Sequence, residues 1–446
     1  MDIRKHLNIV PRFITLILIL AVVFFSLISA TYLIPDSWIA NNVERSLSII
    51  EAEGSYPRFL GINLEAPNYF LNLFKGQDDG SYDFWLGIHL DNSTDRTMLN
   101  KTLADPAMSF IERGQVGTYP RYWHGYLVFL RPMLTVFSLR EIRYFNIVLL
   151  YSLLAVTVVL LKRRTNWTIA VSFALAMQLG GFQAVPVSLQ FSSMFYVMLV
   201  ASIIVLKRYG RRSFDSKLPY FFFTVGATAA FIDFLTAPLL TLGVPLIIIL
   251  LIRLYNNTTE FKRDVAFLFW NCASWAGGYI ILWAIKWPVG SWILKKDVIA
   301  NALNHTINRI QGSEVHVVNR VDSLIKNFYY LTVGVTNKLI LVTVMLLLIM
   351  FIIELRANPN AVKRFKRTIP VLLTALLPYA WIVVIGDHSH IHCWFVYRIQ
   401  IIAAFALLSS ILYSVDIKIL VSKLRQLSLK FGGNHADAPF QERSSI

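Results

Sequence analysis

Long apolar runs separated by short loops rich in lysine and arginine dominate this sequence. The runs are about 17–25 residues long, which is the length that a helix needs to cross the hydrocarbon core of a bilayer. They lack the alternation over about ten residues that marks the strands of a membrane β-barrel. Hydrophobic residues make up 56% of the 446-residue chain and charged residues only 15%, against roughly a quarter in an ordinary soluble domain. Such a chain cannot hide its apolar surface in one water-soluble core, so we predict an all-α polytopic membrane protein.

The apolar runs predict about ten transmembrane helices in a single integral-membrane domain, residues 1–446. The first run is too long for the core of a signal peptide, so we expect it to be retained as a span. The predicted spans are residues 13–34, 145–161, 167–185, 187–206, 218–235, 238–252, 265–287, 331–355, 369–385 and 399–415.

Basic residues predict how these helices are oriented. Arg4 and Lys5 precede the first run, and the triple charge at 162–164 follows the second. Loops rich in lysine and arginine stay in the cytoplasm, so both termini are expected there, including the tail 416–446. The same loops account for the net charge of +16, because they meet anionic lipid headgroups. We therefore expect membrane lipid, and no nucleic acid, as a partner.

The region 35–144, between the first two spans, is predicted to be a long extracytoplasmic loop that carries short helices. Its segment 126–137 is apolar but too short to cross a bilayer, and it is interrupted by Arg131 and Pro132. A re-entrant or interfacial segment fits this pattern.

With this topology, a set of acidic, histidine and isolated basic residues near helix ends falls on the extracytoplasmic side. Charge at membrane depth is costly, so such a cluster is a functional-site hypothesis by default. The cluster consists of Asp36, Asp91, Asp95, His124, Asp233, Lys286, Asp387, His388, His390, His392 and Arg398.

Asp91 and Asp95 are four residues apart, which places both carboxylates on one face of a helix. Such a pair can bind a divalent cation or act as a general base and its orienting partner. The alternative is that Asp91 caps a helix and Asp95 complements its first turn. Further along the loop, Tyr122 and Trp123 directly precede His124. Aromatic rings there suit a sugar-stacking surface, and equally suit an interfacial aromatic belt.

Three histidines alternate at the last extracytoplasmic turn. On a strand His388, His390 and His392 would share one face and could ligate zinc. On a helix His388 and His392 would pair without His390. Arg398 begins the last span, where a guanidinium can bind a lipid phosphate or simply reach the headgroups. Asp233 and Lys286 present the same choice between a functional and an interfacial role.

Four strings make the chain resemble a known class of proteins. They read LDNSTDRTML, YWHGYLVFLRP, FIDFLTAP and HSHIHCWFVYR, at residues 90–99, 122–132, 231–238 and 388–398. With the layout of the spans, they resemble polytopic bacterial proteins of the GT-C superfamily of integral-membrane glycosyltransferases. The large soluble C-terminal domain that many GT-C proteins carry has no counterpart in this sequence.

The resemblance implies a GT-C-like fold in the bacterial plasma membrane and an extracytoplasmic active site. It implies a polyprenyl-phosphate sugar as donor and a cell-envelope glycan or glycolipid as acceptor. Asp91 or Asp95 would be the general base, with Asp36 as the contender. The remaining roles are carried over by position: Lys286 and Arg398 would hold the lipid phosphate, and His124 and His388 would orient the acceptor or leaving group.

A glycosyltransferase is therefore the expected function. It needs no resident cofactor beyond a possible divalent cation, since a phosphate leaving group requires only charge stabilisation. Two alternatives stay open. A transporter or flippase of a lipid-linked sugar would show broken helices and charges at mid-membrane. A membrane acyl- or phospho-group transferase would use the histidine-rich turn, with or without zinc.

Overall fold

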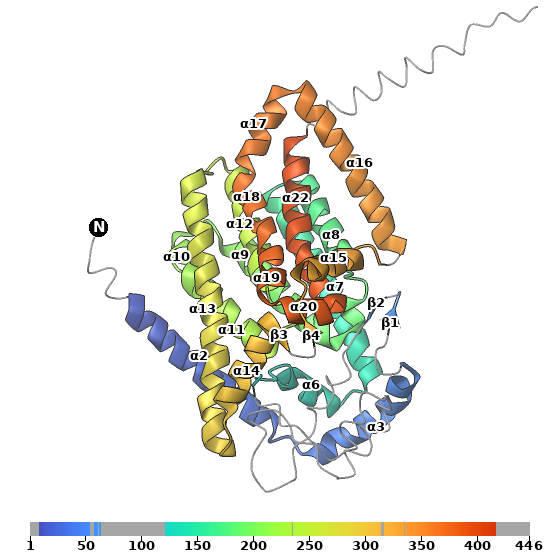
Figure 1. The fold of residues 1–446 in the computed structure, drawn as a ribbon, viewed down its shortest axis with the longest axis vertical. Coiled ribbons are helices and arrows are strands. Elements are labelled where there is room, and N and C mark those ends of the chain that lie inside the picture. Colours follow the sequence, from blue (N-terminus) through green and yellow to red (C-terminus); the bar gives the residue numbers. More distant parts are fainter. Residues whose placement is uncertain are drawn as a thin grey trace, which may run out of the picture.

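The computed structural model describes residues 9–53, 58–60, 62–63, 121–233, 235–313, 316–333 and 335–415. These residues form a bundle that is almost entirely helical (Figure 1). Its strands are two short antiparallel pairs, β1 (Arg58–Phe59) with β2 (Ile62–Asn63) and β3 (Gly312–Ser313) with β4 (His316–Val317). The predicted all-α class is confirmed.

Six stretches of helix in the described part of the chain are long and apolar enough to cross a membrane. This confirms a polytopic membrane protein. Five are single helices and the sixth is the run Cys393–Ser414, which comprises α21 (Cys393–Val396), η6 (Tyr397–Gln400) and α22 (Ile401–Ser414). The five are α2 (Ile9–Thr31), α7 (Leu139–Arg164), α9 (Leu189–Arg208), α13 (Phe261–Leu294) and α16 (Val335–Ala357).

The other predicted spans coincide with shorter or broken helices. α8 (Trp167–Leu179), α11 (Leu218–Ile232) and α12 (Leu240–Tyr255) are apolar but have 13, 15 and 16 residues. At 1.5 Å per residue they reach about 20–24 Å, less than the ~30 Å hydrocarbon core. The predicted span 369–385 belongs to a broken stretch of helix. Its first part, α17 (Pro359–Arg367), makes an angle of 52° with the following helices, which run from Ile369 to Val384. Six spans, or seven with this broken stretch, meet the length criterion, and the number of about ten stays a prediction.

The segments that complete the described chain are short. They are α3 (Asp36–Glu53), α6 (Leu127–Leu134), η4 (Val185–Val187), α10 (Arg212–Asp215), α14 (Val298–Gln311), α15 (Arg320–Tyr330), α18 (Ile369–Leu373), η5 (Thr374–Leu376), α19 (Leu377–Val384) and α20 (Gly386–Ile391).

Two of the single-helix spans, α7 and α13, extend six or seven residues beyond an end of the predicted span. α7 begins at Leu139, six residues before the predicted start of the second span, because Ser138 and Glu141 form a capping box. α13 continues to Leu294, past the predicted end at residue 287. Pro288 lies inside it without ending it, as neighbouring helices in a membrane bundle often allow.

Glycines bring the central helices close together. A Cβ at Gly226 of α11 would lie 2.1 Å from the Trp275 carbonyl oxygen, and one at Gly278 of α13 would lie 2.0 Å from that of Phe223. In the same way, the side chain of Ile401 in α22 packs against Gly180, and that of Ile402 packs against Gly243. Small residues permit this tight approach in lipid, where helices associate by packing.

The bundle has two chemically different ends (Figure 1). The first, here called the basic end, holds α17 and the first turn of α13, and there Arg364 donates to the Ser414 carbonyl at 2.9 Å. The second, here called the loop end, holds α3, α6 and α14. At the loop end the buried Arg131 of α6 donates to the carbonyls of Thr31 and Ile34, which fixes this short helix to the end of α2.

Candidate functional site

A cavity of about 230 Å³ lies between α13, α14 and α19. Aromatic side chains form much of its wall, and basic groups from α14 and from the segment before α6 complete it. We call it the aromatic–basic cavity. Its lining consists of Arg121, Tyr122, Leu235, Trp275, Ala276, Tyr279, Ile280, Trp283, Ala302, His305, Thr306, Arg309, Trp381 and Ile385.

Three of its aromatic side chains form a ladder along α13. Trp275, Tyr279 and Trp283 are four residues apart, so they share one helix face. The Trp275 and Tyr279 rings stack with centroids 5.2 Å apart, and Tyr122 stacks on Trp283 at 5.7 Å. Our sequence reasoning missed this ladder, although its spacing of four was a readable signal.

Hydrogen bonds hold the ladder in place. Trp275 donates its indole N–H to the Thr241 hydroxyl at 2.9 Å, and Trp283 donates to the Arg121 carbonyl at 2.7 Å. The indole faces are therefore fixed before any ligand arrives, which lowers the entropic cost of binding one.

The basic side of the cavity includes Arg309, which has no acidic counterpart among the described residues. Arg309 is half-buried and makes no hydrogen bond or ion pair with any residue that the structure describes. Burial lowers the pKa of His305, and the charges of Arg121 and Arg309 lower it further. His305 is therefore neutral at pH 7, and the positive charge of the cavity comes from its arginines.

The segment 386–392, here called the histidine turn, adjoins this cavity through Leu235. Leu235 lines the cavity and has a positive φ of 61°. The distance from His388 Nε2, in α20, to the Leu235 carbonyl oxygen is 2.9 Å. A carbonyl only accepts, so Nε2 carries the proton and Nδ1 carries a lone pair. Nδ1 has no hydrogen-bond partner among the described residues. Burial, His392 and Arg309 lower the pKa of His388 well below its usual value, so the ring is neutral.

The turn is helical, so the three histidines do not converge. His388 and His392 lie together, with ring centroids 4.8 Å apart. His390 points instead to α15, where its ring nitrogens lie 2.6 Å from Lys326 Nζ and 3.3 Å from Asp322 Oδ2. No group of three histidine, cysteine, aspartate or glutamate side chains in the described part of the chain could hold a metal ion. The strand geometry considered for zinc is thus wrong, because this segment is α-helix.

His124 and Asp233 belong to two segments that are joined by their backbones. Gly125 donates its N–H to the Phe231 carbonyl at 2.8 Å. His124 is buried at a positive φ of 56°. Asp233 follows α11, and its buried carboxylate accepts from the Thr236 N–H at 3.0 Å and also from the Thr236 hydroxyl.

Lys286 and Trp123 lie together in the core beside these segments. Lys286 is fully buried and donates to the Tyr122 carbonyl, with its ammonium 5.9 Å from the centre of the Trp123 ring. Trp123 is also fully buried, and its indole donates to the Leu282 carbonyl at 2.8 Å. Trp123 does not line the aromatic–basic cavity, whereas Tyr122 does.

Arg398 is buried beside Phe191, whose ring lies 6.1 Å from that of Phe395. Its guanidinium carbon lies 3.8 Å from the centre of the Phe191 ring, and Nη1 donates to the Trp394 carbonyl at 3.2 Å. Nε and Nη2 have no hydrogen-bond partner within the described residues. Arg398 is thus a buried cation, but it does not line the aromatic–basic cavity.

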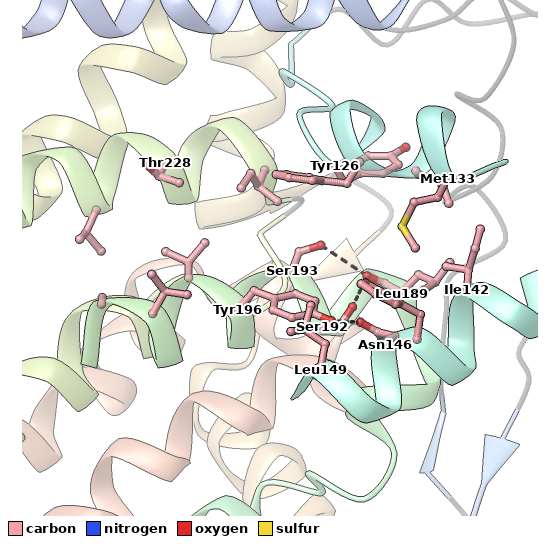
Figure 2. Close-up of a pocket in the computed structure, with 18 of the residues that line it drawn as sticks. Tyr126, Met133, Ile142, Asn146, Leu149, Leu189, Ser192, Ser193, Tyr196 and Thr228 are labelled. Atoms are coloured by element: carbon pink, nitrogen blue, oxygen red, sulfur yellow. Dashed lines mark hydrogen bonds between the residues drawn. The ribbon is translucent and has the colours of Figure 1, made fainter. Parts of the chain in front are cut away.

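A second hollow, here called the apolar groove, has a volume of about 550 Å³ between α6, α7, α9 and α11. Figure 2 shows Tyr126 and Met133 on one side of it, with Asn146, Leu149, Ser192 and Tyr196 opposite. The polar groups in its wall bond to one another or to the backbone. Tyr196 donates to Asn146 at 2.5 Å, and Ser192 donates to the Leu189 carbonyl at 2.9 Å (Figure 2).

Neighbouring residues of the same two segments line both hollows. Tyr122 and Leu235 face the aromatic–basic cavity, whereas Tyr126 and Ile232 face the apolar groove. His124 and Asp233 lie between these pairs in the sequence. The structure therefore brings Tyr122, His124, Asp233 and His388 to one region.

The side chains of three predicted site residues are not among those that the structure describes. Asp91 and Asp95 lie outside the described residues. Asp36 begins α3 at the loop end, and its side chain is not described.

Comparisons of the chain with protein-family models, with curated proteins and with solved structures found no match.

Proposed function

We propose that this protein is an integral-membrane glycosyltransferase, which transfers a sugar from a polyprenyl-phosphate donor to a cell-envelope glycan or glycolipid outside the plasma membrane. One observation carries the proposal. An apolar groove and an aromatic–basic cavity are lined by residues only three or four positions apart in the segments 122–126 and 232–235. A lipid-linked sugar has an apolar tail, an anion and a pyranose ring in that order, and the two hollows offer matching environments.

The apolar groove suits the lipid tail. Its volume lies within the range typical of ligand pockets, about 300–1,000 Å³. The rim residues Phe129, Phe145 and Val200 are exposed on the outside of the bundle, where lipid tails surround a membrane protein. A tail could therefore enter sideways from the bilayer.

The aromatic–basic cavity suits the sugar end. Aromatic rings pack against the apolar faces of pyranose rings, and Arg309 offers a charge that no described carboxylate neutralises. In the proposed transfer, the acceptor hydroxyl oxygen attacks the anomeric carbon and the bond from that carbon to the phosphate oxygen breaks. The electron pair leaves with polyprenyl phosphate, and a general base takes the hydroxyl proton.

We propose two sources for the base. The carboxylates of Asp91, Asp95 and Asp36 belong to the loop region, as the resemblance implies. His388 is a further candidate, because its neutral ring keeps a lone pair on Nδ1 beside the wall of the cavity.

The test is the envelope glycan composition of a deletion strain. The strain is complemented with the wild type or with Asp91→Asn, Asp95→Asn or His388→Gln at matched expression. Asp215→Asn of α10 serves as control, because within the described part of the chain this carboxylate accepts a hydrogen bond only from the Gly210 N–H. Loss of one sugar that the wild type and the control restore, but one site variant does not, supports the proposal. An unchanged glycan in the deletion strain contradicts it.

Transport of a lipid-linked sugar is the second candidate, and one observation favours it. The bent span that runs up to Val384 contains η5 between α18 and α19, and broken helices are typical of transporters. In a transporter mutant the sugar would accumulate on its lipid carrier inside the cell. In a transferase mutant it would accumulate on the carrier outside.

A further inference from the structure

We infer that the aromatic–basic cavity binds a pyranose that carries an anionic group, either a uronate carboxylate or a sugar phosphate. The inference rests on the proposed function, because it names the class of sugar that the proposed site takes. It concerns recognition of the ring and its charge together, in one cavity.

The size of the cavity matches a single sugar ring. A volume of about 230 Å³ lies below the roughly 300 Å³ at which pockets for drug-sized ligands begin. It is comparable with about eight waters at ~30 Å³ each, which suits one monosaccharide and not a chain of them.

The walls offer flat apolar faces from several directions. Tyr279 lies on α13, and Trp381 of α19 meets it edge-on with ring centroids 6.5 Å apart. Tyr122 and Trp283 stack with an interplanar angle of 28°. Fixed aromatic faces of this kind select a rigid ring with apolar C–H faces over a flexible chain.

The charge of the walls selects an anion. Arg309 lines the cavity without a hydrogen bond or ion pair to a described residue. Arg121 also lines the cavity, and its Nη1 donates to the Asn301 amide oxygen at 3.4 Å. The nearby carboxylate of Asp233 interacts electrostatically with Tyr279 but is already held by Thr236. A guanidinium can bind a carboxylate or phosphate through two parallel hydrogen bonds.

The experiment measures ligand binding to the full chain in detergent by tryptophan fluorescence titration. The probes are methyl glucuronoside, glucose 1-phosphate, neutral methyl glucoside and inorganic phosphate. We expect at least one acidic sugar to bind about tenfold or more tightly than methyl glucoside. Arg309→Gln should weaken that binding about tenfold, and Arg309→Lys should restore part of it. Arg212→Gln is the matched control, because Arg212 is exposed on α10.

The two acidic probes separate the possible sources of the ligand. Tighter binding of glucose 1-phosphate assigns the cavity to a phosphorylated sugar, and tighter binding of methyl glucuronoside assigns it to a uronic acid residue. Equal binding of methyl glucoside, binding of inorganic phosphate alone, or no effect of Arg309→Gln would overturn the inference. Because binding is measured without turnover, an unchanged glycan in the deletion strain would contradict the transferase and leave this result standing.

Discussion

His388 and Leu235 are joined by a hydrogen bond of 2.9 Å from the imidazole Nε2 to the main-chain carbonyl oxygen. The bond connects the histidine turn to the segment that follows α11, across 153 residues of sequence. It fixes the tautomer of a buried ring and leaves Nδ1 as the atom available for a proton.

His388→Gln is expected to separate the structural and chemical roles of this residue. The glutamine amide can still donate to Leu235, so thermal stability should stay close to that of the wild type. It offers no basic nitrogen in place of Nδ1, so sugar transfer should fall, by about 10²-fold if the ring acts as a general base. His388→Ala loses the hydrogen bond as well and should lose stability. Full transfer activity in the glutamine variant would show that the ring serves only to hold Leu235.

Arg398→Met is expected to keep or raise stability, and to reduce sugar transfer only if Arg398 holds the lipid phosphate, as the resemblance implies. The guanidinium is buried over Phe191, with two nitrogens that have no hydrogen-bond partner among the described residues. An apolar side chain of similar length removes an unpaired buried charge and retains the packing. Thermal unfolding and sugar transfer are measured on the same preparation. A large loss of stability would instead assign Arg398 a structural role.

The glycine pair in α13 provides a test of helix packing. Gly278→Ala would place a Cβ 2.0 Å from the Phe223 carbonyl oxygen, so α11 and α13 must separate. Overpacking of this kind costs about 1–3 kcal/mol. At Gly277 the nearest atom to an added Cβ is 3.8 Å away, on the Phe223 ring. Gly277→Ala should therefore leave the melting temperature unchanged or slightly raised, and equal losses in both variants would refute this packing.

Stability is expected to fall as the pH falls from 7 to 5. Burial, with the charge of Arg309, lowers the pKa of His392 to about 3, whereas an unfolded histidine has a pKa near 6.5. Between these values the unfolded chain binds a proton that the folded chain does not, so acid favours unfolding. At pH 5 His392 alone accounts for about 2 kcal/mol of lost stability. His392→Gln should flatten the dependence of the melting temperature on pH. His305→Gln should flatten it less, because His305 is less buried.

Filling the apolar groove should affect only long donors. Thr228 of α11 lines the groove (Figure 2), so Thr228→Trp occupies the space that we assign to a lipid tail. Transfer from a long polyprenyl donor should fall about tenfold or more, and transfer from a short-chain analogue should change little. Val171→Trp is the control, because Val171 is exposed on α8 and does not line the groove. Equal losses with both donors would place the lipid elsewhere.

The sequence allowed the fold class to be predicted, because hydropathy reports directly on burial in lipid. It was less informative about helix length. The run 218–235 is apolar throughout its first fifteen residues, but α11 ends at Ile232, where Asp233 binds Thr236. The end of α13 was missed for the opposite reason, since a proline normally suggests a break and Pro288 does not cause one.

The site was predictable only in part. Tyr122, His124, Asp233 and His388 were identified as unusual polar or aromatic residues near helix ends, and the structure brings them to one region. Arg309 and Trp381 were not identified. They lie beside the ladder of α13 because α14 and α19 pack against that helix. A local sequence pattern does not predict such a tertiary contact.

The length of α13 determines how deep the buried lysine lies. The helix has 34 residues, so it is about 51 Å long and exceeds the ~30 Å hydrocarbon core. From Arg263, which is exposed in its first turn, to Lys286 the rise is about 34 Å, or about 32 Å at a common tilt of ~20°. If Arg263 lies at one boundary of the core, Lys286 lies at the other, level with lipid phosphates. Its ammonium is then at the depth of a headgroup, whereas Trp275, about 17 Å from Arg263 along the same normal, lies near the bilayer midplane.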